Sequence, residues 1–314
     1  MTATREPREQ LTQAKTPPER RRRKGGRTSR MLMLFAVPAL VFYAFVLVVP
    51  TLRGAVFAFT DWNGLSQNFT FVGFDNFIDV FESPAAMRAI WVSLLIAFAY
   101  TIFVNLFGLL LALGVHSLIK SRNFLRVLLF APAVMTPVVT AYLWKYILAP
   151  TGPLNELLEG IGLGNLRQEW LATPEWATFS IILVMVWQYS GYHMVIFLAG
   201  LQGIPNELLE AASVDGASTW RKFWSITLPL LAPAITINLM LSIIGGLKVF
   251  DTVWVMTGGG PGGATHTLST LIYRDAFQFG EVGPSIALAM ILFVLVGIIS
   301  GAQYRGLLTQ EKKL

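Results

Sequence analysis

Apolar residues gather into six runs along the chain, and each run is long enough to cross a lipid bilayer as a helix. Polar and charged residues, with Gly- and Pro-rich stretches, lie between the runs. This pattern predicts an all-α membrane protein with six transmembrane helices. The predicted spans are 31–52, 89–115, 125–148, 177–200, 230–249 and 284–304.

The first 30 residues differ from the rest because they are polar, basic and carry three prolines. They predict a disordered cytoplasmic tail at 1–30, before a six-helix transmembrane domain at 31–305 and a cytoplasmic end at 306–314. A secretory signal peptide also begins with a basic region, but its apolar part runs only about 7–15 residues. The apolar run 31–52 is longer, so we expect it to be kept as the first span.

The distribution of lysine and arginine predicts which side of the membrane each loop faces. Eighteen of the 24 lie in the tail, in loops 116–126 and 201–229 and at the C-terminal end, whereas the other three loops hold four. Because cytoplasmic loops carry the excess of positive charge, the N- and C-termini are both predicted to be cytoplasmic.

Composition argues against several kinds of site. Only 13% of residues are charged, whereas a soluble domain carries about a quarter, so a large soluble core with its own site is not expected. The chain has no cysteine, and its three histidines lie far apart without an HExxH-like pair, so no metal site is expected. The glycine run 258–263 suggests a phosphate cradle, but no lysine in the chain directly follows a glycine. Without a Walker A motif, we expect this run to form a tight turn on the outer side.

The loop 202–229 carries the most specific signal in the chain. Glu207 and Glu210 suit the first turns of a helix, and Gly216 can end that helix in a left-handed conformation. Ser218 can then cap a second helix, in which Trp220 and Trp224 share a face. The loop therefore predicts a helix–turn–helix on the cytoplasmic side. It either docks on a cytoplasmic partner or packs beneath its own helices, and these physical arguments favour neither.

The spacing of Glu210-Ala211-Ala212, Gly216 and Ile226-x-Leu228-Pro229 resembles the EAA loop of bacterial ABC importer permeases. Three further stretches resemble the carbohydrate-uptake (maltose/glycerol-3-phosphate-type) branch of that family. They are "DGAS" at 215–218, "FD…T.GGP" at 250–261 and "LAGLQ.IP" at 198–205. The likeness covers about residues 30–305 and leaves out the basic tail.

The resemblance implies a type I ABC importer permease fold in the bacterial inner membrane. The chain would be the permease subunit of an ATP-driven, binding-protein-dependent importer for a di- or oligosaccharide. Its implied partners are a second homologous permease, an ABC ATPase dimer and an extracellular or periplasmic solute-binding protein. The ATPase would bind ATP and Mg, so no catalytic residue and no cofactor are expected in this chain, and no nucleic acid. In this family the EAA loop forms a coupling helix, so the expected ATPase-coupling residues are Glu210, Ala211, Ala212, Asp215, Gly216, Ile226, Leu228 and Pro229.

The predicted substrate pathway rests on polar residues within two spans. Gln188, Tyr189 and Tyr192 share a face of the fourth span, and polar groups in lipid usually face a bundle interior or a wet cavity. In the fifth span, Asn238, Ser242 and Gly246 share a face, and both faces match those that hold sugar in maltose-type members of the family. The alternative is that these residues only pack helices.

Two further points stay open at this level. Lys248 is expected to pair with Asp251, three residues on, or to extend to the membrane surface. The alternative functions are import of glycerol phosphate or a polyol and, more distantly, a secondary transporter, a membrane enzyme or a scaffold without a pathway. A secondary transporter would usually show acidic residues inside the spans or two similar halves, and the sequence has neither feature.

Overall fold

The computed structural model describes residues 26–116 and 121–311, with side chains for 35–116 and 121–306. Its described part consists of helices joined by loops and turns, with a single isolated β-bridge between Thr60 and Phe71. The elements are α1 (Gly26–Tyr43), η1 (Ala44–Val48), α2 (Val49–Phe57), α3 (Asp75–Glu82), α4 (Pro84–His116), α5 (Arg122–Val134), α6 (Pro137–Ile147), α7 (Pro153–Gly160), η2 (Gly164–Leu166), α8 (Pro174–Gln202), α9 (Asn206–Val214), α10 (Thr219–Lys222), η3 (Phe223–Thr227), α11 (Leu228–Leu230), α12 (Ala232–Leu247), α13 (Asp251–Thr257), α14 (Leu268–Arg274), η4 (Asp275–Phe279) and α15 (Val282–Glu311).

The chain divides into two units, 1–52 and 53–314. In the first unit, α1 starts at Gly26, upstream of the predicted start of the first span, and runs through the π-helical turn η1 into α2. Residues 35–57 of this helix are apolar and long enough to cross a membrane. Most of the predicted tail, 1–25, lies outside the described residues.

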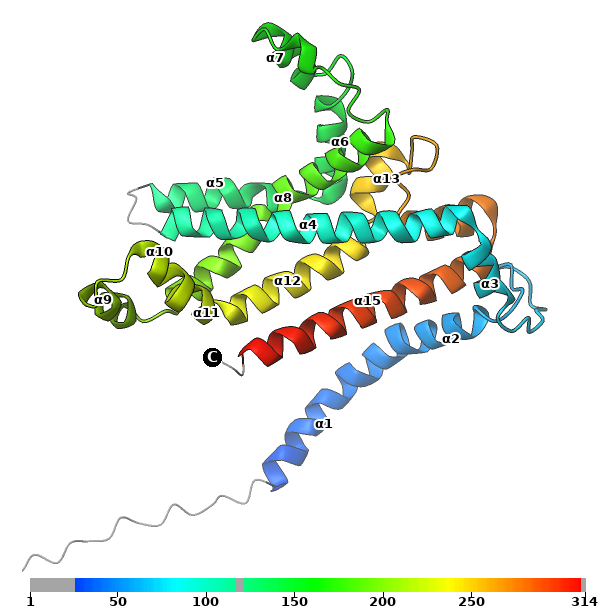
Figure 1. Cartoon of the computed structure of the whole chain (residues 1–314). Helices are drawn as coiled ribbons and strands as arrows, with labels where there is room; N and C mark the ends of the chain where they lie inside the picture. The colour runs from blue at the N-terminus through cyan, green and yellow to red at the C-terminus, as the bar shows by residue number, and fades with distance from the viewer. Residues whose placement is uncertain (1–25, 117–120, 312–314) are drawn as a thin grey trace, which may run out of the picture. The chain divides into compact units, whose positions relative to one another are not determined.

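The core of the second unit is built on the long helix α4, which packs along α8 and α12. The helices approach closely because small residues lie where they cross. A side chain at Gly246 would lie 2.7 Å from the Cα of Ala97, and one at Gly108 would lie 2.9 Å from the Cβ of His193. Figure 1 shows α9–α11 and the C-terminal end of α15 at one end of the long helices, with α3 and α13 at the other.

The third predicted span is broken rather than straight. Helices α5 and α6 meet at an angle of 95° around Met135 and Thr136. Pro132 and Pro137 flank the break, and proline removes a backbone donor that the helix needs to continue. The carbonyl of Met135 instead accepts a hydrogen bond from Gln188 Nε2 of α8 at 3.0 Å. The break therefore keeps a partner for its freed carbonyl, as an apolar surrounding requires.

The number of candidate spans follows from how these bends are counted. Four helices of the described chain are long and apolar enough to cross a membrane, and six spans result if each bent pair is one span. The second bent pair is 219–230 with 232–247, at 67°. At the C-terminal end, α15 continues to Glu311, beyond the predicted end of the last span at 304, and the candidate span within this helix ends at Gly306.

Residues 58–82 form a compact structure around helix α3. The amphipathic helix α3 buries Asn76, which donates two hydrogen bonds of 2.8 Å, to the carbonyls of Ala58 and Thr60. Asp61 accepts hydrogen bonds from the backbone and hydroxyl of Thr70, both at 2.6 Å. These bonds hold the pKa of Asp61 below its ordinary value.

The closest helix contact yields a stability prediction. A Cβ at Gly191 of α8 would overlap the carbonyl oxygen of Leu129 in α5. We expect Gly191→Ala to destabilise the chain by about 1–3 kcal/mol, because the packed helices must separate. The measurement is the Tm of the detergent-solubilised protein, with Gly297→Ala of α15 as the control. A Cβ at Gly297 meets nothing within 4 Å, so an equal loss of Tm in both variants would contradict the packing argument.

Candidate functional site

The helix–turn–helix predicted for 202–229 is present. Helix α9 ends at Val214, and Gly216 takes the left-handed conformation with φ of +78°. Ser218 begins the second helix by accepting a hydrogen bond from the backbone N–H of Arg221 at 3.3 Å. Lys222 Nζ donates across the turn to Ser213 Oγ at 3.0 Å. Both the turn and the cap predicted from the sequence are confirmed, and the lysine joins the two helices.

One face of this hairpin is left open. In the described chain, α9 has no buried residue, and no other helix packs extensively on it. Trp220, Phe223 and Trp224 form an aromatic cluster on the second helix, with Trp220 71% exposed. Of the predicted coupling residues, Glu210, Ala211, Asp215 and Gly216 are exposed, and Ala212, Ile226, Leu228 and Pro229 are partly buried.

A cavity of about 370 Å³ lies between α8 and α12, next to the start of α6 and of α13. We call it the tyrosine cavity. It brings together aromatic faces, apolar groups and two charges from segments far apart in the sequence. Its main lining residues are Tyr100, Tyr189, Tyr192, Leu241, Lys248 and Asp251.

The structure separates the six predicted pathway residues into two groups. Tyr189 and Tyr192 line the tyrosine cavity. The remaining four (Gln188, Asn238, Ser242 and Gly246) are buried and outside its lining. On α12 the cavity face carries Leu241, Gly245 and Lys248 instead. The sequence signal for this second face was weak, because it combines one leucine, one glycine and one lysine.

Three of the residues outside the cavity hold helices together. His193 Nδ1 and Asn238 Oδ1 share a hydrogen bond of 2.7 Å between α8 and α12. Ser242 Oγ donates to the carbonyl of Asn238 at 2.8 Å and accepts from Asn105 Nδ2 of α4 at 2.9 Å. Gln188 supports the break in the third span. Gln188, Asn238 and Ser242 therefore join helices next to the cavity, and their partner His193 is itself part of the cavity wall.

The ion pair expected between Lys248 and Asp251 is absent from the described structure, whose ion pairs are Arg167–Glu159 and Arg274–Asp275. The expectation assumed continuous helical spacing. Instead, Lys248 closes α12 and Asp251 opens α13, and Phe250 between them has φ −128° and ψ −64°. Both charged residues line the tyrosine cavity.

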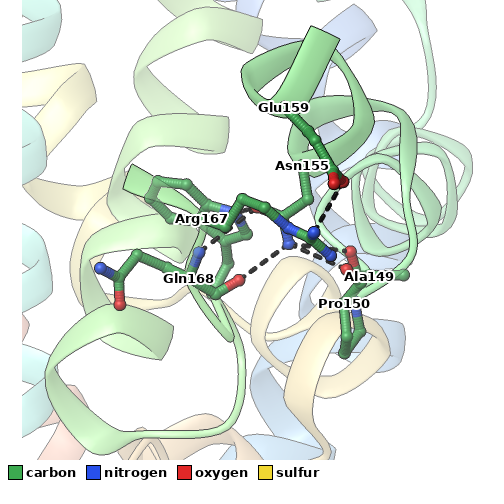
Figure 2. Close-up of polar contacts among 7 residues, drawn as sticks. Ala149, Pro150, Asn155, Glu159, Arg167 and Gln168 are labelled. Carbon is green, nitrogen blue, oxygen red and sulfur yellow. Dashed lines mark hydrogen bonds and ion pairs between the residues drawn. The ribbon is translucent and has the colours of Figure 1, made fainter. Parts of the chain in front are cut away.

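The loop 149–176 forms a cap held by one side chain, Asn155, which the sequence did not single out. Figure 2 shows its Nδ2 reaching the carbonyls of Pro150 at 3.1 Å and Gln168 at 2.9 Å, with a longer contact to Ala149. Its Oδ1 accepts from the indole N–H of Trp170 at 3.0 Å. In the same view Arg167 pairs with Glu159 at 2.7 Å. A buried amide thus orders a loop that is rich in turn residues.

The glycine run 258–263 forms the expected tight turn. The ring of His266 occupies the space where a side chain at Gly259 would lie. Gly259 has φ of +86°, which favours glycine for a second reason. Thr265 Oγ1 donates to the carbonyl of Gly260 at 2.6 Å, and His266 Nδ1 shares a hydrogen bond with Thr270. The space inside the glycine turn is therefore occupied by the side chains of His266 and Thr265.

Comparison with solved structures identifies the class of fold. The chain matches a subunit of the structure described as "bacterial alginate ABC transporter in complex with alginate pentasaccharide-bound periplasmic protein". The TM-score is 0.76 at 26% identity, and the match covers 88% of this chain and 93% of that one. The chain, with its bent helix pairs and its α9–α11 hairpin, therefore has the type I ABC importer permease fold.

Sequence comparison names the family. Residues 104–311 match the binding-protein-dependent transport system inner membrane component, and the chain belongs to that family. It is 33% identical over 271 residues to the multiple sugar-binding transport system permease of Streptococcus mutans, covering 86% of this chain and 93% of that protein. It is 32% identical over 277 residues to the trehalose/maltose transport system permease of Thermococcus litoralis, covering 86% and 91%. The resemblance drawn from the EAA-like loop is confirmed.

The Asn155 cap yields a second prediction. We expect Asn155→Asp to loosen the cap, because an oxygen cannot make the amide's donated hydrogen bonds and two carbonyls lose their partner. Amide hydrogen exchange across 150–173 should rise by about tenfold or more. The control is Glu159→Gln, which removes an exposed ion pair worth about 1 kcal/mol or less. Unchanged exchange in the Asn155 variant would show that the cap does not depend on this side chain.

A third prediction concerns pH. His266 lies in the loop between α13 and α14, where burial lowers the pKa of its imidazole and Arg274 lowers it further, against an opposing effect of Asp275. Its folded pKa lies below the unfolded value of about 6.5, so its contribution to stability is complete above that pH and is lost as pH falls below it. The protection of the 257–267 amides, measured as their exchange rate relative to the intrinsic rate at the same pH, should therefore fall between about pH 7.5 and about pH 5.5. His266→Gln should remove this dependence and His116→Gln should keep it.

Proposed function

We propose that this chain is the permease subunit of an ATP-driven, binding-protein-dependent importer for a di- or oligosaccharide. The observation that carries the proposal is the exposed hairpin of α9 and α10, which holds the EAA-like motif at one end of the helical bundle. Family membership supports it, as do the sugar names of two relatives at 32–33% identity. The matched solved transporter is in complex with a periplasmic protein, which supports a solute-binding protein as a partner.

The proposed topology has six spans with both termini in the cytoplasm. The excess of lysine and arginine in the loops 116–126 and 201–229 supports it. Figure 1 adds a geometric reason, because the C-terminal end of α4, the α9–α11 hairpin and the C-terminal end of α15 lie at the same end of the long helices. In this arrangement the tyrosine cavity lies beside the middle of α8 and the outer end of α12.

Coupling to ATP hydrolysis is assigned to α9. The helix would insert into a cleft of an ABC ATPase dimer, which binds ATP and Mg. Ala211 and Ala212 allow close approach, and Glu210 offers a carboxylate to a basic residue of the partner. The Lys222–Ser213 bond joins α9 to the second helix, so movement of α9 is passed to the fifth span as one body. Closing the ATPase would then shift the spans between inward-facing and outward-facing packings.

The tyrosine cavity is the proposed half of the sugar pathway in this subunit. A second, homologous permease would close it as a heterodimer. Tyr189 and Tyr192 present aromatic faces to the C–H groups of a sugar ring and hydroxyls to its oxygens. We assign Gln188, Asn238, Ser242 and Gly246 to support of this wall from behind, through their hydrogen bonds and close packing.

The coupling assignment is tested by Gly216→Pro and Glu210→Lys. Proline cannot adopt the left-handed turn, and charge reversal at a packed interface costs a few kcal/mol, so uptake should fall about tenfold or more. Immunoblots of the membrane fraction should show that both variants insert as the parent does. The tagged parent should co-purify with an ATPase and a second six-span subunit, and the Glu210 variant should lose the ATPase.

The matched control is Glu156→Lys, which reverses an exposed acidic residue of α7 in the outer cap. It should keep the ATPase in the pull-down. A parent chain that emerges alone from the pull-down would reject the importer assignment, and normal uptake by both hairpin variants would reject the coupling assignment.

A further inference from the structure

The tyrosine cavity holds two charges that nothing in the described chain neutralises. Lys248 is exposed and Asp251 is half-buried, and neither belongs to the ion pairs of the described residues. Lys145 is the other lysine near the outer end of a span, and it differs because its Nζ donates to the carbonyl of Val255 at 3.2 Å. The remaining titratable groups on the cavity wall are His193 and the three tyrosines. Lys248 and Asp251 are therefore the available cation and anion of this cavity.

Both charges are held on a fixed piece of backbone. The carbonyl of Val249, between them, accepts a hydrogen bond from Thr267 Oγ1 at 3.0 Å. The ring of Phe250 stacks on Trp254 and contacts Tyr273 edge-on. The Lys145 bond to Val255 ties α13 to α6. A bound solute would thus meet pre-positioned groups, which reduces the entropy lost on binding.

The chemistry of these two groups matches a polyhydroxylated solute. A carboxylate only accepts hydrogen bonds and an ammonium only donates them, whereas a sugar hydroxyl does both. Asp251 can accept from one hydroxyl while Lys248 donates to a neighbouring oxygen, and the tyrosine rings cover the C–H faces. An anionic solute would gain from Lys248 but would meet Asp251 in the same small volume, where like charges repel strongly.

We propose that Lys248 and Asp251 are specificity-determining residues of the pathway, which together bind hydroxyls of a neutral sugar and reject anionic solutes. This inference rests on the proposed importer function and specifies its substrate class. It predicts that removal of the carboxylate relaxes the charge preference, whereas removal of the ammonium weakens binding without relaxing it.

The first experiment needs no identified solute. The chain has no cysteine, so Leu241→Cys places a single thiol of this subunit on the cavity wall. The assembled transporter in membrane vesicles is treated with a cationic and an anionic methanethiosulfonate reagent, and labelling of this chain is followed by its mass. Adding Asp251→Asn should raise the ratio of the labelling rate by the anionic reagent to that by the cationic reagent about threefold or more. Adding Lys248→Met should lower this ratio by a similar factor. If neither change moves the ratio, the two charges do not act in the cavity and the proposal fails.

The second experiment measures uptake of maltose and trehalose as neutral probes and digalacturonate as an anionic probe. Asp251→Asn should lower neutral uptake about tenfold and raise the anionic-to-neutral ratio, because a site built around hydrogen bonds discriminates through them. Lys248→Met should lower uptake of all probes, and Lys248→Arg should restore part of it. Asp79→Asn and Arg88→Met remove exposed charges outside the cavity and should retain more than about half of parent uptake.

The outcomes distinguish a failure of the specificity assignment from a failure of the proposed importer function. A parent transporter that takes up a neutral probe, together with unchanged uptake by both cavity variants, overturns the specificity assignment and leaves the importer standing. A parent that takes up no sugar counts against the proposed function, while the labelling ratio still decides whether the two charges face the cavity.

Discussion

The hydrogen bond between Gln188 and the carbonyl of Met135 shows the constraint that governs this chain: a backbone group in an apolar surrounding must find a partner inside the protein. The third span turns by 95° at that point, between Pro132 and Pro137. The side chain of Gln188, from the neighbouring helix α8, reaches the carbonyl that the turn releases. Gln188 is fully buried where it makes this bond. The bend also places the start of α6 beside the tyrosine cavity.

The same constraint explains why polar residues inside the bundle divide into two kinds. His193, Asn238, Ser242 and Asn105 pair with one another and tie α4, α8 and α12 together. The tyrosines, Lys248 and Asp251 remain available at a cavity that water can enter. The paired polar groups position helices, while those that line the cavity face the proposed pathway.

Local chemistry allowed the hairpin to be predicted almost residue by residue, because Gly216 acts through its own backbone and the Ser218 hydroxyl bonds a backbone N–H three residues away. Which face of α12 lines the cavity was harder to predict from the sequence. Periodicity groups Asn238, Ser242 and Gly246 together, but which face meets α4 depends on Ala97, a residue 149 positions before Gly246. The ion pair of Lys248 with Asp251 failed for a similar reason, since helical spacing does not survive the turn at Phe250. The role of Asn155 could not be predicted from the sequence, because a single asparagine in a turn-rich loop is common.

The cap at 149–176 is organised mainly from within, by one asparagine amide and the carbonyls that surround it. Its described ties to the helices are the contact of Trp170 with Trp176, the bond from Ser180 Oγ to the carbonyl of Trp170, and the packing of Leu154, Trp170 and Leu171 against the helical core. Such a segment can change its length and surface between related proteins while the membrane helices stay the same. The cap is accordingly an exchangeable module: a grafted cap that keeps the asparagine would retain its fold and bring a new outer surface with it.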